Sequence, residues 1–99
     1  MTLAELKHSV TKAEPPAGLA PALAALWWDA KGDWERAHAL IMDEGGNDCA
    51  WVHAYLHRRE GDLDNAGYWY AKAGKAVPAG PLQDEWDSIT AALLSAPSP

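Results

Sequence analysis

The 99-residue chain has no phenylalanine, a single cysteine and few basic residues. Because Cys49 has no second cysteine to pair with, an internal disulfide is excluded, as is usual in a reducing compartment. Only 8 lysines and arginines stand against 14 aspartates and glutamates, which gives a formal net charge of −6. Nucleic-acid binding requires clustered cations that displace counterions, so this balance argues against a nucleic-acid partner.

Long apolar runs are also missing, although 48% of the residues are hydrophobic. No segment approaches the roughly 18 uninterrupted apolar residues of a membrane span. The N-terminus carries Glu5 and lacks the basic-then-apolar pattern of a secretion signal. We therefore expect one domain over residues 1–99, located in the cytoplasm and without a membrane partner.

Apolar residues recur at helical spacing along the chain, and nowhere do they alternate long enough to predict a strand. Thr2 and Glu5 have the spacing of a capping box, and Asp33 and Asp62 precede further helical stretches as N-caps. The expected fold class is all-α, with five to six short helices. The expected segments are an N-terminal helix, a Pro/Gly linker, two repeats, a C-terminal helix and a tail: 1–13, 14–20, 20–45, 47–78, 81–95 and 96–99.

One short pattern occurs twice. Residues 31–37 read Lys-Gly-Asp-Trp-Glu-Arg-Ala, and residues 60–66 read Glu-Gly-Asp-Leu-Asp-Asn-Ala, with Gly32 and Gly61 29 residues apart. In each copy the glycine ends one helix and the aspartate caps the next. Helical units repeated at such a period stack on one another, because a single unit cannot bury its own apolar face.

The second copy resembles the second helix of a tetratricopeptide (TPR) unit. The matching positions are the helix-ending glycine, the small residues, the aromatic and the final proline: Gly61, Ala66, Ala73, Tyr70 and Pro78, with Ala54 in the preceding helix. The first copy matches at Ala25, Gly32, Ala37 and Ile41, but it is shorter than the family's period of about 34 residues. The resemblance covers roughly residues 20–80 and implies stacked helical hairpins. Residues 51–62 are also similar to a set of small bacterial proteins of unassigned function.

The resemblance to TPR units implies a groove that binds a protein or peptide. In a helix from about Cys49 to Glu60, one face carries Trp51, Tyr55 and Arg58, with Arg59 at its margin. Rigid aromatics and planar guanidinium groups are well suited to such contacts. Trp28 is a further candidate for partner binding, since it points away from Trp27. The alternative is that Trp51 and Tyr55 pack under the first or last helix while the two arginines are solvated.

Two histidines suggest a different function. His53 and His57 lie four residues apart and share one helix face with Glu60, a spacing that also occurs in zinc sites. No third ligand is apparent from the sequence, because His8 and His38 stand alone. The two rings are thus either buried structural histidines or metal ligands. The alternative function is a small-molecule or metal-binding protein that uses His53, His57 and the tryptophan-rich surface.

Other sites are not indicated. No Ser-His-Asp arrangement or phosphate-binding glycine loop occurs, and the acidic segment 43–48 lacks the ligand pattern of a calcium loop. Most of the six tryptophans are expected in the core, where a small alanine-rich bundle needs bulk. We expect a non-catalytic interaction module without a cofactor. Its partner is a protein or peptide, including a second copy of the chain, because so short a stack leaves its ends uncovered.

Overall fold

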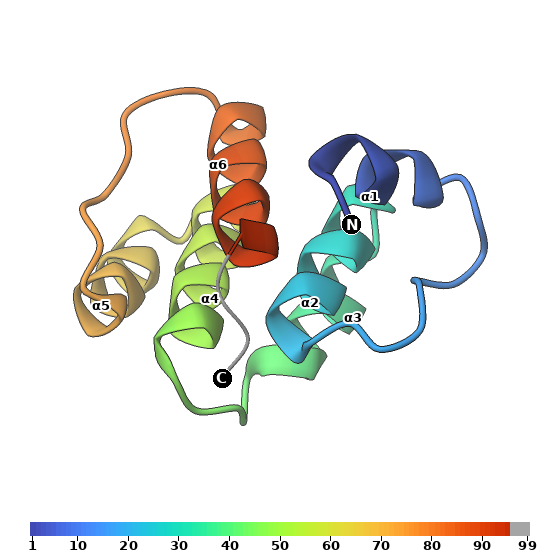
Figure 1. Ribbon diagram of the computed structural model, residues 1–99. Coiled ribbons are helices and arrows are strands. Elements are labelled where there is room, and N and C mark those ends of the chain that lie inside the picture. Colours follow the sequence, from blue (N-terminus) through green and yellow to red (C-terminus); the bar gives the residue numbers. More distant parts are fainter. Residues whose placement is uncertain (96–99) are drawn as a thin grey trace.

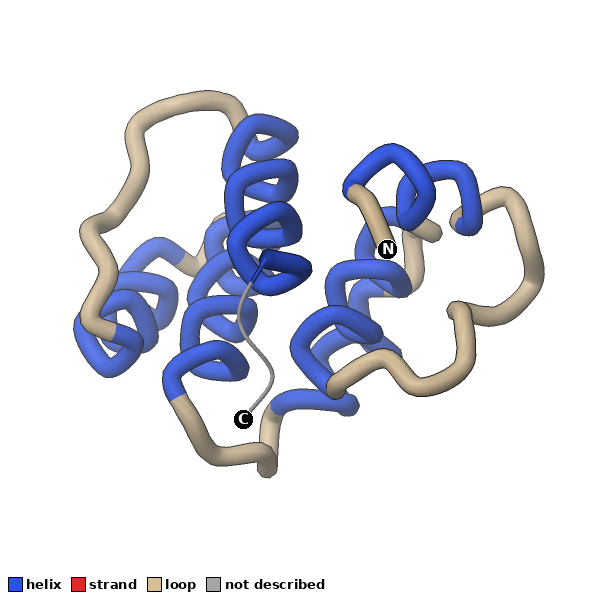
Figure 2. Tube along the Cα trace, viewed as in Figure 1, coloured by secondary structure: helices blue, strands red, loops and turns tan. Residues whose placement is uncertain are grey.

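The computed structural model describes residues 1–95 as six α-helices joined by turns and loops (Figure 1). No strand occurs among these residues, so the expected all-α class is confirmed (Figure 2). The tail expected at 96–99 lies outside the described residues. None of the described helices has the length and apolar character that crossing a bilayer requires. The helices are α1 (Leu3–Ser9), α2 (Pro21–Ala30), α3 (Trp34–Ile41), α4 (Asn47–Glu60), α5 (Leu63–Ala73) and α6 (Leu82–Ser95).

Most helix ends follow the signals in the sequence. Thr2 and Glu5 form the expected capping box at the start of α1, with both reciprocal hydrogen bonds present. Asp33 and Asp62 begin α3 and α5, and each side chain accepts a hydrogen bond from the backbone amide three residues later. Gly61 ends α4 with a left-handed φ of +88°, a conformation that is costly for any residue with a Cβ atom.

The start of α4 differs from the expectation. The sequence predicted a helix from about Cys49 with Asn47 or Asp48 as its cap, but α4 begins at Asn47 and its N-cap is Gly46. Gly46 adopts φ +99° and ψ 159°, a region that is essentially restricted to glycine. This conformation turns the chain directly into the helix, so Asn47 falls within the first turn and no side chain caps it.

Helix α4 is the centre of the fold. It packs most extensively against α5 and also contacts α2, α3 and α6, while α2 packs closely against α3. Figure 1 shows α4 with α5 on one side and the α1–α3 group on the other, and α6 beside α4 and that group. Over half of the α4 residues are buried: Cys49, Ala50, Val52, His53, Ala54, Tyr55, Leu56 and His57.

The core has two parts. The larger part joins α1, α2, α3, α4 and α6 and contains the fully buried Trp27 and the almost fully buried Trp86. The smaller part lies between α4 and α5, where Tyr70 packs against two alanines, Ala54 and Ala66. The other four tryptophans are partly buried and pack against one or both of these clusters. Of the six tryptophans, most of which were expected in the core, two are therefore fully enclosed there and four lie at its edge.

We expect two glycine-to-alanine substitutions to have opposite effects on the free energy of unfolding. Gly61→Ala should destabilise by about 1 kcal/mol, because its left-handed φ is unfavourable for an L-residue with a side chain. Gly67→Ala in α5 should stabilise by about 0.5–1 kcal/mol, since alanine favours the helix and an added Cβ would meet no atom within 4 Å. Urea unfolding of both variants measures the difference; equal effects would contradict the assigned backbone conformations.

Candidate metal centre

His53 and His57 lie on the face of α4 that is turned toward α3. Their spacing of four residues places one ring above the other, with centroids 4.8 Å apart and planes 26° apart. Each residue is only 6% exposed. Two imidazoles are therefore held side by side in a position that is largely shielded from solvent.

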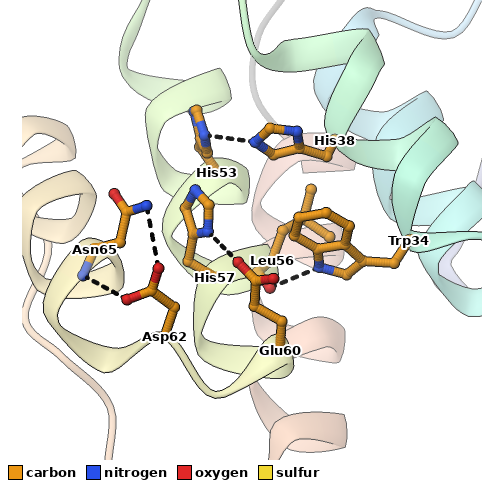
Figure 3. A network of polar contacts seen from close by, with 8 residues as sticks. All are labelled: Trp34, His38, His53, Leu56, His57, Glu60, Asp62 and Asn65. Atoms are coloured by element: carbon orange, nitrogen blue, oxygen red, sulfur yellow. Dashed lines mark hydrogen bonds and ion pairs between the residues drawn. The ribbon is translucent and has the colours of Figure 1, made fainter.

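His38 of α3 completes a group of three imidazoles (Figure 3). Its Nε2 atom lies 3.1 Å from Nε2 of His53. One ligand nitrogen from each of His38, His53 and His57 lies within 4.8 Å of the other two. We call these three residues the His cluster. The cluster connects α3, the second helix of the α2–α3 pair, with α4, the first helix of the α4–α5 pair.

Glu60 fixes the orientation of His57. Its Oε2 atom lies 2.6 Å from Nδ1 of His57, and because a carboxylate can only accept, Nδ1 carries the proton in this contact. The other ring nitrogen of His57 points toward His53 (Figure 3). Metal-binding histidines usually have this arrangement, in which a carboxylate accepts from one ring nitrogen while the other nitrogen faces the ion.

Tryptophan rings hold the remaining two imidazoles. Trp34 stacks on His38 with centroids 4.8 Å apart and planes 8° apart, and its Nε1 donates to the backbone carbonyl of Leu56 at 2.7 Å. Trp69 of α5 stacks on His53 at 3.9 Å and 17°. Each ring is therefore braced by a large flat neighbour, which limits its rotation and shields it from water.

The surroundings of His53 and His38 favour the neutral form of both rings. Burial, followed by repulsion from His57 and His38, lowers the pKa of His53 to about 4. Burial and then His57 also lower the pKa of His38, against an opposing effect of Glu60. The neutral ring is the form that donates a lone pair to a metal ion.

The spacing of the nitrogen atoms is compatible with one coordination sphere. Metal–nitrogen bonds of about 2.0–2.1 Å in a tetrahedral site put neighbouring nitrogens about 3.3–3.4 Å apart. The 3.1 Å between His38 and His53 is close to this value. The largest separation in the cluster, at most 4.8 Å, would have to shorten when an ion binds.

His38 is the residue that the sequence analysis missed. It was set aside because it stands 15 residues before His53, with a glycine-rich turn between them. A usable signal was its place four residues after Trp34, on the face of α3 that meets α4. The three predicted candidates, His53, His57 and Glu60, all belong to the site. Glu60, however, contacts the His57 ring on the side that is turned away from His53 (Figure 3).

A second acidic group borders the cluster. Asp62, Glu60 and His57 also have ligand atoms within 4.8 Å of one another. The Asp62 side chain, however, accepts from both the backbone and the side-chain amide of Asn65 at the start of α5 (Figure 3). Asp62 thus serves as a helix cap beside the site.

Two of the residues predicted to bind a partner are instead tied to α2. Tyr55 is 1% exposed, and its hydroxyl donates to Asp29 at 3.0 Å. Arg59 Nε lies 3.0 Å from the other carboxylate oxygen of Asp29, an ion pair without hydrogen-bond alignment. Burial raises the pKa of Asp29 against the effects of Arg59 and Tyr55. Tyr55 has no surface to offer a partner, because α2 covers the face that was expected to line a groove.

Arg58 is engaged with α6 in a similar way. Its guanidinium donates to Glu85 at 2.8 Å and to the backbone carbonyl of Gly80. Tyr70 of α5 donates to the other oxygen of Glu85, and burial and this contact raise the pKa of Tyr70. The α4 face that was expected to line a groove thus contacts α2 through Tyr55 and α6 through Arg58. The alternative from the sequence, with Trp51 and Tyr55 under a terminal helix and the arginines in solvent, does not describe Arg58.

The remaining predicted residues lie near the surface. Trp51 is partly buried with Lys75 Nζ 4.2 Å from its ring centroid. Trp28 is partly buried with the guanidinium carbon of Arg36 at 4.3 Å. Each ring thus makes a cation–π contact with a side chain of the same protein. Neither ring takes part in the contacts of the His cluster.

We expect Arg58→Met to destabilise the protein by about 3–5 kcal/mol, because it leaves the Glu85 carboxylate buried without its cation. Glu85→Gln in the same background should recover a substantial part of the loss, since the amide needs no counter-charge. Chemical unfolding of the two variants provides the comparison. If the single substitution costs less than about 1 kcal/mol, the value typical of an exposed pair, the buried ion pair is not structurally important.

We expect stability to fall as the pH decreases from 7 to 5. The pKa of His53 is about 4 in the folded chain and about 6.5 when unfolded, so between these values the unfolded state binds more protons. In metal-free buffer the wild type should lose about 2 kcal/mol more than His53→Gln over this range. Thermal unfolding at several pH values measures this; parallel curves would show that His53 titrates normally.

Known proteins do not assign a role to this arrangement. No family model, curated protein or solved structure matches the chain. The TPR resemblance therefore stays a prediction from the repeated pattern. The function has to be inferred from the chemistry of the side chains that the fold brings together.

Proposed function

We propose that this protein binds a divalent transition-metal ion through His38, His53 and His57. The observation that carries the proposal is the convergence of three imidazole nitrogens from two helices. Glu60 supports the site by holding the Nδ1 proton of His57. This is the alternative function from the sequence, now with the third ligand that it lacked.

The donor set selects a class of metal. Imidazole nitrogens suit zinc, copper, nickel and iron, whereas magnesium and calcium require oxygen ligands. The nearest oxygen donor, the Glu60 carboxylate, is hydrogen-bonded to His57 at 2.6 Å. The low pKa of His53, about 4, keeps its ring available as a ligand at neutral pH. We therefore favour zinc, nickel or copper.

A purely structural cluster is the competing explanation. A shared proton between His38 and His53 satisfies one nitrogen on each ring, and Glu60 satisfies one on His57. Such a network would hold α3 against α4 without any ion. The two explanations differ in one respect, because only a metal site gains stability when a metal is added.

We expect one zinc or nickel ion to bind per chain in calorimetric titration and to raise the unfolding temperature. At a free metal concentration of 100 times the dissociation constant, the gain is about 2.7 kcal/mol. His38→Gln and His53→Gln should abolish stoichiometric binding. Glu60→Gln should weaken it by about 10–100-fold, since it removes only the support of His57.

The control for this titration is His8→Gln. His8 is an exposed histidine on α1 and is not part of the cluster, so its loss should leave binding unchanged. Circular dichroism checks that each variant remains helical. Absence of stoichiometric binding by the folded wild type, or equal loss in the His8 and His38 variants, would overturn the proposal.

Partner binding by a helical repeat stays a prediction. Of its proposed residues, Tyr55 is enclosed by α2 and Arg58 is engaged with α6. Arg59, whose side chain is 44% exposed, keeps accessible surface, and Trp51 and Trp28 are partly exposed. A partner would therefore meet these three residues at the surface and would not enter a groove lined by the inner face of α4.

A further inference from the structure

We propose that the metal ion at the His cluster keeps one exchangeable coordination position that binds water or a small inorganic anion. This inference rests on the proposed metal-binding function and specifies the ligand class of the same site. It follows from three features of the cluster: the number of its donors, the direction of the Glu60 contact and the exposure of His38.

The number of donors leaves the coordination sphere incomplete. Zinc and related ions take at least four ligands, and sites with three histidines hold water or a substrate in the remaining position. Among residues 1–95, His57 is the side chain of a metal-ligating type that completes a group of three with His38 and His53. The cluster therefore supplies three nitrogens and leaves at least one position for a ligand from solution.

Glu60 is poorly placed to fill that position. Its carboxylate contacts Nδ1 of His57, whereas the other nitrogen of the same ring points toward His53 (Figure 3). These two nitrogens lie on opposite sides of the imidazole, so an ion bound by the second nitrogen lies across the ring from Glu60. The carboxylate can hold the His57 proton, but it cannot bind that ion without giving up this contact.

Access from solvent is provided on the α3 side. His53 and His57 are each 6% exposed and form the inner wall. His38 is only partly buried, although Trp34 covers one face of its ring. The inner wall is thus closed by α4 and Trp69, and the free coordination position is expected at the edge of the cluster near His38.

Charge determines which ligand this position prefers. Three neutral imidazoles leave the full double positive charge on the ion, and the single carboxylate of Glu60 reaches it only through His57. A positive charge in a partly buried site is costly unless it is compensated. An anionic ligand such as hydroxide, azide or thiocyanate lowers this charge, so anions should compete effectively with water.

Cobalt provides the test, because the visible spectrum of Co²⁺ reports its ligands. The full chain is loaded with one equivalent of Co²⁺ and titrated with sodium azide, and the titration is repeated with thiocyanate. We expect a saturable, one-to-one change of the visible bands with each anion. The Glu60→Gln variant should bind Co²⁺ about 10–100-fold more weakly, yet it should show the same spectral response once loaded.

The outcomes separate this inference from the function on which it rests. If the folded chain does not bind Co²⁺ or zinc, the proposed function fails. If Co²⁺ binds but neither anion changes its spectrum, the coordination sphere is closed and only the inference fails. The same conclusion follows if Glu60→Gln alters the spectrum of the anion-free protein, because Glu60 would then be a ligand. His8→Gln serves as the matched control and should respond as the wild type does.

Discussion

The burial of α4 is the constraint on which the rest of the structure depends. This helix contacts four other helices, yet it carries tyrosine, arginine and histidine side chains among its alanines and leucine. Polar groups that are removed from water need partners within the protein. The partners are found on three of the surrounding helices: Asp29 on α2, His38 on α3 and Glu85 on α6. Three neighbours of α4 are thus fixed by at least one specific polar contact in addition to apolar packing, whereas α5 is held by apolar packing and by the stacking of Trp69 on His53.

These polar contacts fall into two kinds. Asp29 and Glu85 each receive one tyrosine hydroxyl and one arginine, so a donor and a cation meet a single carboxylate. Such groups are complete in themselves, because the buried charge is matched and both carboxylate oxygens are contacted. The His cluster is different. It contains three bases and no matching acid except Glu60 at its margin, and its nitrogens are turned toward one another. Ring nitrogens gathered in this way could bind a cation in place of the proton between His38 and His53, which is why the cluster and not the arginines carries the proposed function.

The sequence predicted the local features of this molecule well and the long-range ones poorly. The capping box at Thr2 and the caps at Asp33 and Asp62 could be predicted because each involves residues only three apart. The face of α4 that meets solvent could not be predicted, since it depends on where α2 and α6 lie. The expected groove residues Tyr55 and Arg58 therefore became internal contacts. His38 was missed for the same reason: only the packing of α3 on α4 brings it to His53. His53 and His57 were recognised together because they share one helix.

If the proposed metal site is correct, the placement of the cluster links metal affinity to the packing of α3 on α4. His38 belongs to α3, and the other two ligands belong to α4, which begins at Gly46 without a side-chain cap. The site therefore exists only while these two helices are packed together, so an ion bound to it stabilises this interface more than any other. The carboxylate groups of Asp29 and Glu85 bind Tyr55, Arg58 and Arg59, which lie on another face of α4 than His53 and His57. They position the helix, whereas Trp34, Trp69 and Glu60 position the rings. Two sets of contacts thus determine one geometry: the first holds α4 in the fold, and the second orients the three rings within it.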